Sequence, residues 1–249
     1  MNLSSKCIGL IPSRLSSTRL PGKALADIAG MPLVIHTAKR ALLSDSLDDV
    51  YVCTDSDKIA QACSNYSVKV IMTSPNCLNG TERISEASSH FTCDFFVDIQ
   101  GDEPLIDPNH IDKVVSALKD PSNESDVILP VLRVPYASSD SIVRVQVSKT
   151  NRVMTLSRAS IPHIYNQNPH NIYKHLSIIG FTRESLSRYS SLKPSHYELV
   201  ENVELLRALE NDMRITALPL NGDSFSVDLQ DDLDRARLAM INDSYFGKY

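Results

Sequence analysis

At 249 residues the chain is long enough to bury one sizeable core, or one core with a smaller appended lobe. Hydrophobic residues make up 42% of it and charged residues 22%, which is ordinary for a globular protein and excludes a disordered or fibrous chain. The formal net charge of −5 argues against a nucleic-acid partner, since non-specific binding of nucleic acid normally requires a basic surplus.

Cysteine usage and hydropathy indicate the compartment. The five cysteines are scattered and include no CxxC pair, so neither a zinc site nor a disulfide framework is indicated. We interpret them as free thiols in a reducing compartment. The apolar run at residues 7–12 is too short for a signal-peptide core, and no stretch approaches the length of a membrane span. We therefore expect a cytoplasmic protein with no membrane partner.

The first half of the chain alternates short apolar runs with helical patterns. The clearest helical pattern covers residues 33–43, with Pro32 suited to the first turn. Such alternation predicts a mostly parallel, Rossmann-like sheet flanked by helices. The predicted strands are 7–11, 50–54, 68–72, 95–99 and 127–131, and the weaker predicted helices are 58–64, 82–88 and 111–118.

After residue 132 the pattern changes to one typical of antiparallel strands. We therefore expect an α/β chain that forms one domain over residues 1–249, with a smaller β-rich insertion near 133–185 before the chain returns to the core. The predicted strands here are 142–148, 153–157, 175–182 and 214–218, and the predicted helices are 183–190, 198–210 and 231–242.

A basic loop follows the first predicted strand. It contains Arg14, Arg19 and Lys23 among several hydroxyl groups and one glycine. Ligands of open α/β sheets bind beyond the carboxyl ends of the strands, and these three cations could offset the charge of a triphosphate. The loop contains neither the GxxxxGK[ST] pattern of a P-loop nor the GxGxxG of a dinucleotide fold. The alternative is a solvated loop with chance clustering of charge.

Carboxylates occur at two further strand ends. Asp102 and Glu103 come directly after the strand that ends near Gln100. Magnesium prefers one or two carboxylates together with phosphate oxygens and water, so a carboxylate here could meet a nucleotide triphosphate. Asp228 follows the apolar run 225–227 and precedes a predicted helix. From the pattern alone, Asp228 is equally well interpreted as the N-cap of that helix.

These segments together resemble a known family. Arg14-x4-Arg19-Leu20-Pro21-Gly22-Lys23 resembles the signature loop of sugar-activating cytidylyltransferases, and the chain resembles CMP-Kdo synthetases, formally 3-deoxy-manno-octulosonate cytidylyltransferases. The resemblance spans nearly the whole chain in the right order. The other matching segments are Asn79-Gly80-Thr81-Glu82-Arg83, Gln100-Gly101-Asp102-Glu103-Pro104, Ser157-Arg158, Ile161-Pro162, His175, Glu198-x2-Glu201-x2-Glu204-x2-Arg207 and Val227-Asp228.

The resemblance implies an enzyme that transfers CMP from CTP to an acidic Kdo-type sugar and releases pyrophosphate, for lipopolysaccharide biosynthesis. It implies that Arg14, Arg19 and Lys23 bind phosphates, and that Arg14, Lys23 and Asp102 are catalytic. Asp102 and Asp228 would bind Mg²⁺. The family's typical homodimer, formed through the inserted sheet, is expected by the same resemblance.

The resemblance also implies a set of substrate-binding residues. Each has a structural alternative: Thr81 as an N-cap, Arg83 as a surface charge, and His175 as a satisfied structural histidine. Glu198, Glu201, Glu204 and Arg207 could equally form the solvated face of one helix with i,i+3 ion pairs. The substrate-binding residues implied are Arg19, Asn79, Thr81, Arg83, Gln100, Arg158, His175 and Glu204, with Arg83, Gln100, His175 and Glu204 near the sugar.

The chain departs from the family pattern mainly near the sugar. Ile179 replaces a tyrosine, Leu205 replaces a glutamine, and Asn79 replaces a serine, while the nucleotide and metal residues are intact. Lost hydrogen-bonding groups change which sugar a site accepts. Our hypothesis is that the sugar is a modified Kdo, with 8-amino-3,8-dideoxy-manno-octulosonate favoured because retained carboxylates would attract an ammonium.

Three other functions fit parts of the pattern. The nearest is a cytidylyltransferase for a nine-carbon acidic sugar, although the segments around Asn79 and Asp102 fit the Kdo branch better. A non-catalytic nucleotide-binding protein of the same fold is the second. A glycosyltransferase is the third, but the DxD letters Asp55-Ser56-Asp57 are better explained if Asp55 caps the next helix.

Overall fold

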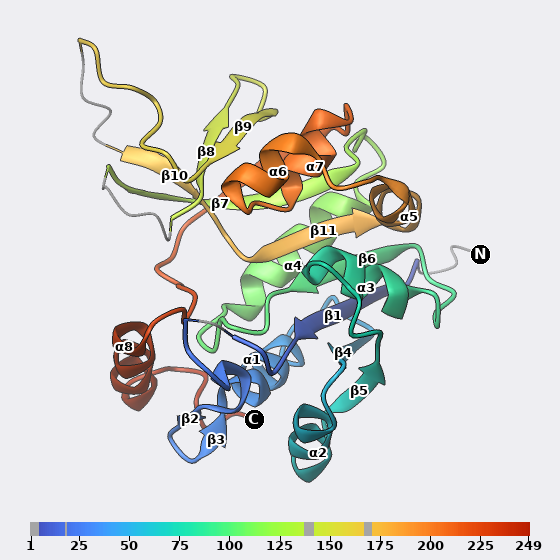
Figure 1. Cartoon of the computed structure of the whole chain (residues 1–249), viewed down its shortest axis with the longest axis vertical. Coiled ribbons are helices and arrows are strands. Elements are labelled where there is room, and N and C mark those ends of the chain that lie inside the picture. Colours follow the sequence, from blue (N-terminus) through green and yellow to red (C-terminus); the bar gives the residue numbers. More distant parts are fainter. Residues whose placement is uncertain (1–4, 18, 137–141, 167–170) are drawn as a thin grey trace.

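The computed structural model describes residues 5–17, 19–136, 142–166 and 171–249. Within these ranges the chain forms one ten-stranded mixed sheet flanked by helices, which confirms the predicted α/β class (Figure 1). The order across the sheet is β5 (Lys69–Met72), β4 (Asp49–Thr54), β1 (Cys7–Ser13), β6 (Phe95–Ile99), β11 (Ile178–Thr182), β7 (Val127–Pro135), β10 (Asn171–His175), β8 (Arg144–Val147) and β9 (Val153–Ser157), and β12 (Ile215–Leu220) also pairs with β7.

The first four strands of the chain's large sheet are parallel, and all of them lie where the apolar runs predicted strands. All seven residues of β1 are buried, because helices cover both faces of the sheet. Leu10 packs into the core on one face and Ile11 into the core on the other. The helices on the Ile11 side are α1 (Leu33–Ala41), α2 (Asp57–Asn65) and α4 (Pro108–Lys119), and those on the Leu10 side are α3 (Gly80–Ser88), α5 (Arg183–Ser191) and α7 (Leu205–Glu210).

The β-rich segment continues the main sheet. β8, β9 and β10 are antiparallel and extend the sheet from the far part of β7 (Figure 1). The predicted single strand 175–182 is wrong in one respect, because Leu176 and Ser177 interrupt it between β10 and β11. This interruption allows β11 to pair with β6 as well as with β7. Parts of the expected insertion, at 137–141 and 167–170, lie outside the described residues.

The predicted helix 198–210 is two helices. They are α6 (His196–Glu201) and α7, and Asn202 ends α6 with a left-handed backbone at φ 52°. Asn tolerates this conformation better than most residues. The helical spacing of the surrounding residues does not predict a break at this position. The chain therefore turns between Glu201 and Glu204.

The C-terminal part packs against a smaller core. A short helix, η1 (Lys23–Leu25), leads to the separate two-stranded sheet of β2 (Asp27–Ile28) and β3 (Met31–Pro32). The last helix, α8 (Gln230–Ile241), buries Leu233 and Met240 against Ile28. This packing brings the segment before α8 next to the basic loop. In the described part of the chain, no helix is long and apolar enough to cross a membrane.

Candidate active site

A cavity of about 910 Å³ opens at the carboxyl ends of β1 and β6. One wall is the basic loop after β1, and the opposite wall comes from α6 and the start of α7. The structure thus brings together most of the residues that the sequence predicted. Those that line the cavity are Arg14, Arg19, Lys23, Asn79, Arg83, Gln100, Asp102, Arg158, Glu204 and Asp228, whereas Thr81 and His175 do not.

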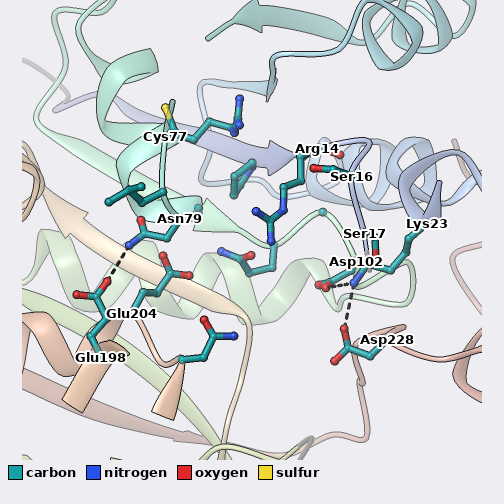
Figure 2. A pocket seen from close by; sticks show the side chains of 18 of the residues that line it. Arg14, Ser16, Ser17, Lys23, Cys77, Asn79, Asp102, Glu198, Glu204 and Asp228 are labelled. Atoms are coloured by element: carbon teal, nitrogen blue, oxygen red, sulfur yellow. Dashed lines mark hydrogen bonds and ion pairs between the residues drawn. The ribbon is translucent and has the colours of Figure 1, made fainter. Parts of the chain in front are cut away.

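Two carboxylates converge on one lysine on the loop side. Lys23 Nζ lies 2.7 Å from Asp102 Oδ2 and 3.1 Å from Asp228 Oδ1 (Figure 2). Arg19 also donates to Asp228 Oδ1, at 2.9 Å. Burial opposes the charge of Lys23, but Asp102 and then Asp228 raise the pKa of the ammonium above its ordinary value. The group stays charged and holds the two acids together.

Asp228 does not cap α8, so that interpretation is wrong. The N-cap position is Leu229, and Asp232 supplies the carboxylate that accepts from the backbone N–H groups of Asp228 and Leu229. The Asp228 side chain is therefore free to turn toward Lys23 and Asp102, as Figure 2 shows.

Two glycines shape the loop side. Gly22 has a left-handed backbone at φ 70°, which suits a residue without a Cβ and lets the chain turn into η1 with Lys23 at its start. A Cβ added to Gly101 would lie 3.0 Å from the Pro12 carbonyl oxygen. A larger residue there would push the Asp102 loop away from the basic loop. Arg14 is exposed and points into the cavity in Figure 2.

The N-terminus of α3 forms the floor between the two walls. Asn79 is its N-cap: its Oδ1 accepts from the Glu82 backbone N–H at 2.8 Å. The interpretation of Thr81 as the cap is therefore wrong. Thr81 is fully buried, and its backbone N–H donates to Glu204 Oε2 at 2.9 Å. Thr81 thus positions a cavity residue from outside the cavity.

Arg83 is only 4% exposed, so it is not a surface charge. Its guanidinium donates to Thr73 Oγ1 at 2.6 Å and lies 3.5 Å from Asp55 Oδ1. Asp55 was expected to cap α2, and this is also wrong, because the cap is Ser56, whose Oγ accepts from Ile59 N–H. A buried arginine at the cavity is a suitable partner for an acidic substrate.

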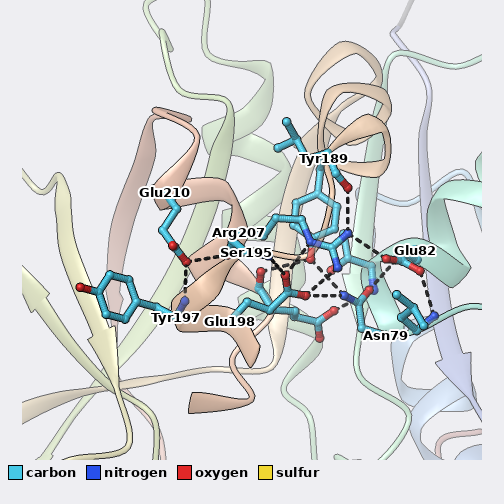
Figure 3. A network of polar contacts seen from close by, with 12 residues as sticks. Asn79, Glu82, Tyr189, Ser195, Tyr197, Glu198, Arg207 and Glu210 are labelled. Carbon is cyan, nitrogen blue, oxygen red and sulfur yellow. Dashed lines mark hydrogen bonds and ion pairs between the residues drawn. The ribbon is translucent and has the colours of Figure 1, made fainter. Parts of the chain in front are cut away.

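A buried ion network ties the opposite wall to α3 (Figure 3). Arg207 is 1% exposed and binds Glu198 through two hydrogen bonds of 2.7 Å. It also donates to Glu82 Oε1 at 2.8 Å, and Asn79 Nδ2 donates to Glu198 Oε1 at 3.1 Å. Burial disfavours the charge of Arg207, yet Glu198 and Glu82 raise the pKa of its guanidinium. The interpretation of Glu198 and Arg207 as a solvated helix face is therefore wrong.

Glu201 joins the end of β9 to α6. Its carboxylate accepts from the Ser157 hydroxyl at 2.7 Å and from the Arg158 backbone N–H at 2.8 Å. The Arg158 Nε donates in turn to the Glu201 carbonyl oxygen at 2.9 Å. Donors of the chain itself thus satisfy the Glu201 carboxylate, and they hold Arg158 at the cavity edge.

Three sugar-side positions lie outside the cavity wall. His175, at the end of β10, does not line the cavity, and desolvation lowers the pKa of its imidazole to about 4, so the ring is neutral at pH 7. Ile179 and Leu205 are each 1% exposed and belong to the core. The expectation that these two replacements change the cavity surface directly is wrong.

Sequence reasoning missed several lining residues. Glu198 and Glu201 were recognised only as part of the family match, because helical spacing alone placed them on a solvated face. Asp98 does not itself line the cavity, and it was not noticed either, although an acid inside the apolar run 95–99 is a signal of its own. The other lining residues that no role was predicted for include Ser13, Ser16, Ser17, Cys77, Leu78 and Leu199.

The fold and the cavity define a nucleotidyltransferase. A basic loop at the carboxyl end of a parallel strand faces two carboxylates that meet at one point, which is an arrangement suited to a nucleoside triphosphate. A model of the cytidylyltransferase family matches residues 8–215.

Comparison with individual relatives identifies the family within this class. A 3-deoxy-manno-octulosonate cytidylyltransferase of Chlorobium limicola is 39% identical over 235 residues, which cover 92% of this chain and 94% of the relative. One of Zea mays is 37% identical over 95% of this chain and 81% of its own length. The solved structure of a CMP:2-keto-3-deoxy-manno-octonic acid synthetase complexed with CTP matches with a TM-score of 0.89 and 31% identity, over 95% of this chain and 99% of that one. The chain belongs to the CMP-Kdo synthetase family of cytidylyltransferases.

Proposed function

We propose that this enzyme transfers CMP from CTP to a Kdo-type 3-deoxy-octulosonate, releasing pyrophosphate. The observation that carries the proposal is the meeting of Lys23, Asp102 and Asp228 at the edge of a cavity that also contains a buried arginine, Arg83. The first group suits a triphosphate and the second suits the carboxylate of an acidic sugar. The product would supply lipopolysaccharide assembly.

The chemistry follows from positioning and charge. The anomeric hydroxyl of the sugar attacks the α-phosphorus of CTP and gives up its proton to solvent, the bond from that phosphorus to the bridging oxygen breaks, and pyrophosphate leaves with the bonding electrons. Arg14, Arg19 and Lys23 would neutralise the triphosphate and the leaving pyrophosphate. Such a step needs no covalent intermediate, because holding the two substrates in line supplies most of the acceleration.

The same site fits magnesium. Asp102 and Asp228 already hold one cation, the Lys23 ammonium, between carboxylate oxygens, which are the ligands that magnesium prefers. Among the described residues no group of three or more His, Cys, Asp or Glu side chains is placed to hold a metal, so CTP would complete the coordination shell. Bound there, Mg²⁺ would offset the charge of the phosphate oxygens.

We further propose that the favoured sugar is 8-amino-3,8-dideoxy-manno-octulosonate. The support is the acidic wall of the cavity, formed by Glu198, Glu201 and Glu204. Glu198 is neutralised by Arg207, and Glu201 accepts from Ser157 and Arg158. Glu204 accepts a hydrogen bond from Thr81 but forms no ion pair within the described residues. A carboxylate without a counter-ion favours a cationic group on the ligand.

The test is pyrophosphate release from CTP and Mg²⁺ with Kdo and its 8-amino analogue side by side. Release with either sugar supports the proposed reaction, and a higher kcat/KM with the amino sugar supports the proposed specificity. Equal or better use of ordinary Kdo would remove the specificity. Turnover only with a nine-carbon acidic sugar would favour the alternative cytidylyltransferase, and no turnover with any of them would favour a non-catalytic role.

We also propose a homodimer formed through the β8–β10 part of the sheet. Exposed apolar side chains occur there and on the adjoining α6, namely Met154, Tyr197, Leu199 and Val200. Large apolar side chains exposed on a monomer can be buried when two copies associate. Light scattering of the purified chain tests the proposal, because a monomer at micromolar concentration would contradict it.

A further inference from the structure

Two carboxyl groups on the sugar side of the cavity are left without a counter-charge. Asp98, in β6, is fully buried, and Glu204 lines the cavity just before α7. The nearby arginines are bound elsewhere: Arg83 pairs with Asp55, and Arg207 pairs with Glu198 and Glu82. In the part of the chain that the structure describes, neither Asp98 nor Glu204 forms an ion pair.

Asp98 is also short of hydrogen bonds. Its Oδ2 accepts from Gln100 Nε2 at 2.8 Å, and Gln100 lines the cavity. Its Oδ1 is buried and has no partner among the described residues. Such an oxygen is rare in folded proteins, because water has been removed and nothing replaces it. Burial raises the pKa of Asp98 well above its ordinary value, and the charge of Glu204 raises it further.

Two positions next to this pair carry apolar side chains. Ile179 lies directly opposite Asp98 in the ladder between β6 and β11, and Leu205 follows Glu204 in the chain. Both side chains are almost fully buried and neither has a hydrogen-bond donor. These are two of the three sugar-side positions at which the sequence departs from the family pattern. The departures therefore leave the acid pair, and not the cavity surface, without partners.

We propose that Asp98 and Glu204 form a subsite for the primary ammonium group of an amino sugar, beside Gln100 at the cavity wall. An ammonium carries a positive charge and three donors, so it can serve Asp98 Oδ1 and Glu204 at once. A hydroxyl carries one donor and no charge, so it would leave both carboxyl groups without a counter-charge. This inference rests on the proposed function, because the sugar must occupy this cavity.

The experiment replaces Asp98 with a neutral residue of the same shape. Asp98→Asn keeps the acceptor for Gln100 and removes the charge. We expect the kcat/KM for 8-amino-Kdo to fall about 10- to 100-fold, mainly through KM, since a hydrogen bond between charged groups contributes about that factor. We expect the kcat/KM for Kdo to change less than about threefold or to rise, since the repulsion between the charges of Asp98 and Glu204 is relieved.

Two further variants separate a specific role from damage. Glu201→Gln is the matched control: it neutralises another cavity carboxylate, but one already satisfied by Ser157 and Arg158. Glu201→Gln should change the kcat/KM values for the two sugars by the same factor. Glu204→Gln should lower the preference for the amino sugar in the same direction as Asp98→Asn, and it carries the test if Asp98→Asn fails to fold.

The outcomes distinguish this inference from the proposed function. An unchanged ratio of the two kcat/KM values in Asp98→Asn and Glu204→Gln would overturn the subsite while leaving the enzyme a Kdo-type cytidylyltransferase. A wild-type enzyme that uses only ordinary Kdo would do the same. A wild-type enzyme that releases pyrophosphate with neither sugar would instead refute the proposed function, and the subsite with it.

Discussion

Lys23 donates a 2.7 Å hydrogen bond to Asp102 across 79 residues of sequence, and it contacts Asp228 on its other side. The three side chains come from the basic loop, the loop after β6 and the segment before α8. Without the ammonium, two carboxylates that point at one position would repel each other. Lys23 therefore keeps the two acids at one position, and in the proposed function it also offers its charge to a triphosphate.

Lys23→Met removes that charge while keeping much of the apolar stem. We expect kcat/KM for CTP to fall by about 10²- to 10³-fold, the usual effect of removing one donor from a charged transition state. Steady-state pyrophosphate release measures it. Lys69→Met is the control, because Lys69 is exposed on β5 and pairs with Asp49 away from the cavity. Comparable loss in both variants would contradict the assignment.

Asp228→Asn tests the metal assignment independently of sugar specificity. We expect the Mg²⁺ concentration that gives half-maximal activity to rise at least about tenfold, because the proposed magnesium site would lose one of its two protein carboxylates. Excess chelator should abolish turnover of the wild-type enzyme, and added Mg²⁺ should restore it. Asp231→Asn, which changes an exposed acid in the first turn of α8, should leave the Mg²⁺ dependence unchanged. Identical Mg²⁺ curves for Asp228→Asn and the wild type would rule out this ligand.

The sequence predicted the parallel half of the sheet because buried strands and amphipathic helices leave local patterns. The strand 95–99 matches β6 in both bounds. What local patterns could not predict was the break at Asn202, since its left-handed backbone depends on tertiary contacts. After that break Glu198 and Glu204 have different partners: Glu198 binds Arg207, whereas Glu204 forms no ion pair within the described residues, and its charge raises the pKa of Asp98. Whether a glutamate at such a position is solvated, paired or available to a ligand depends on contacts with residues distant in sequence, which local patterns do not reveal.

The contact between Arg207 and Glu198 should be a large contributor to stability. Arg207→Met leaves Glu198 and Glu82 buried without their counter-charge, and we expect the free energy of unfolding to fall by about 3–5 kcal/mol. Urea denaturation followed by circular dichroism measures it. Arg237→Met, which removes an exposed arginine from α8, should change stability by less than about 0.5 kcal/mol.

A double variant sharpens this prediction. Glu198→Met combined with Arg207→Met removes both charges of the pair, so the destabilisation should be smaller than the sum of the two single changes. If the loss of unfolding free energy in the double variant equals the sum of the losses in the two single variants, the two side chains act independently, contrary to the network in Figure 3.

His175 predicts how stability depends on pH. Desolvation, with smaller effects from Lys174 and Arg158, lowers the pKa of its imidazole from about 6.5 to about 4 in the folded protein. Between these two values the unfolded chain binds a proton at this position and the folded chain does not, so His175 makes stability fall as the pH falls from about 6.5 to about 4. The full contribution, on the order of 3 kcal/mol, is present above pH 6.5 and is lost completely only below pH 4.

His175→Gln should remove that dependence, because glutamine does not titrate. Buried acids such as Asp98, whose pKa is raised, act in the opposite direction, so only the difference between the variant and the wild type isolates the histidine. We expect the wild type to lose about 2 kcal/mol more than His175→Gln between pH 7.5 and pH 4.5, as measured by urea denaturation at both values. Parallel losses would mean that the imidazole is hydrated in the folded protein and titrates near 6.5 in both states.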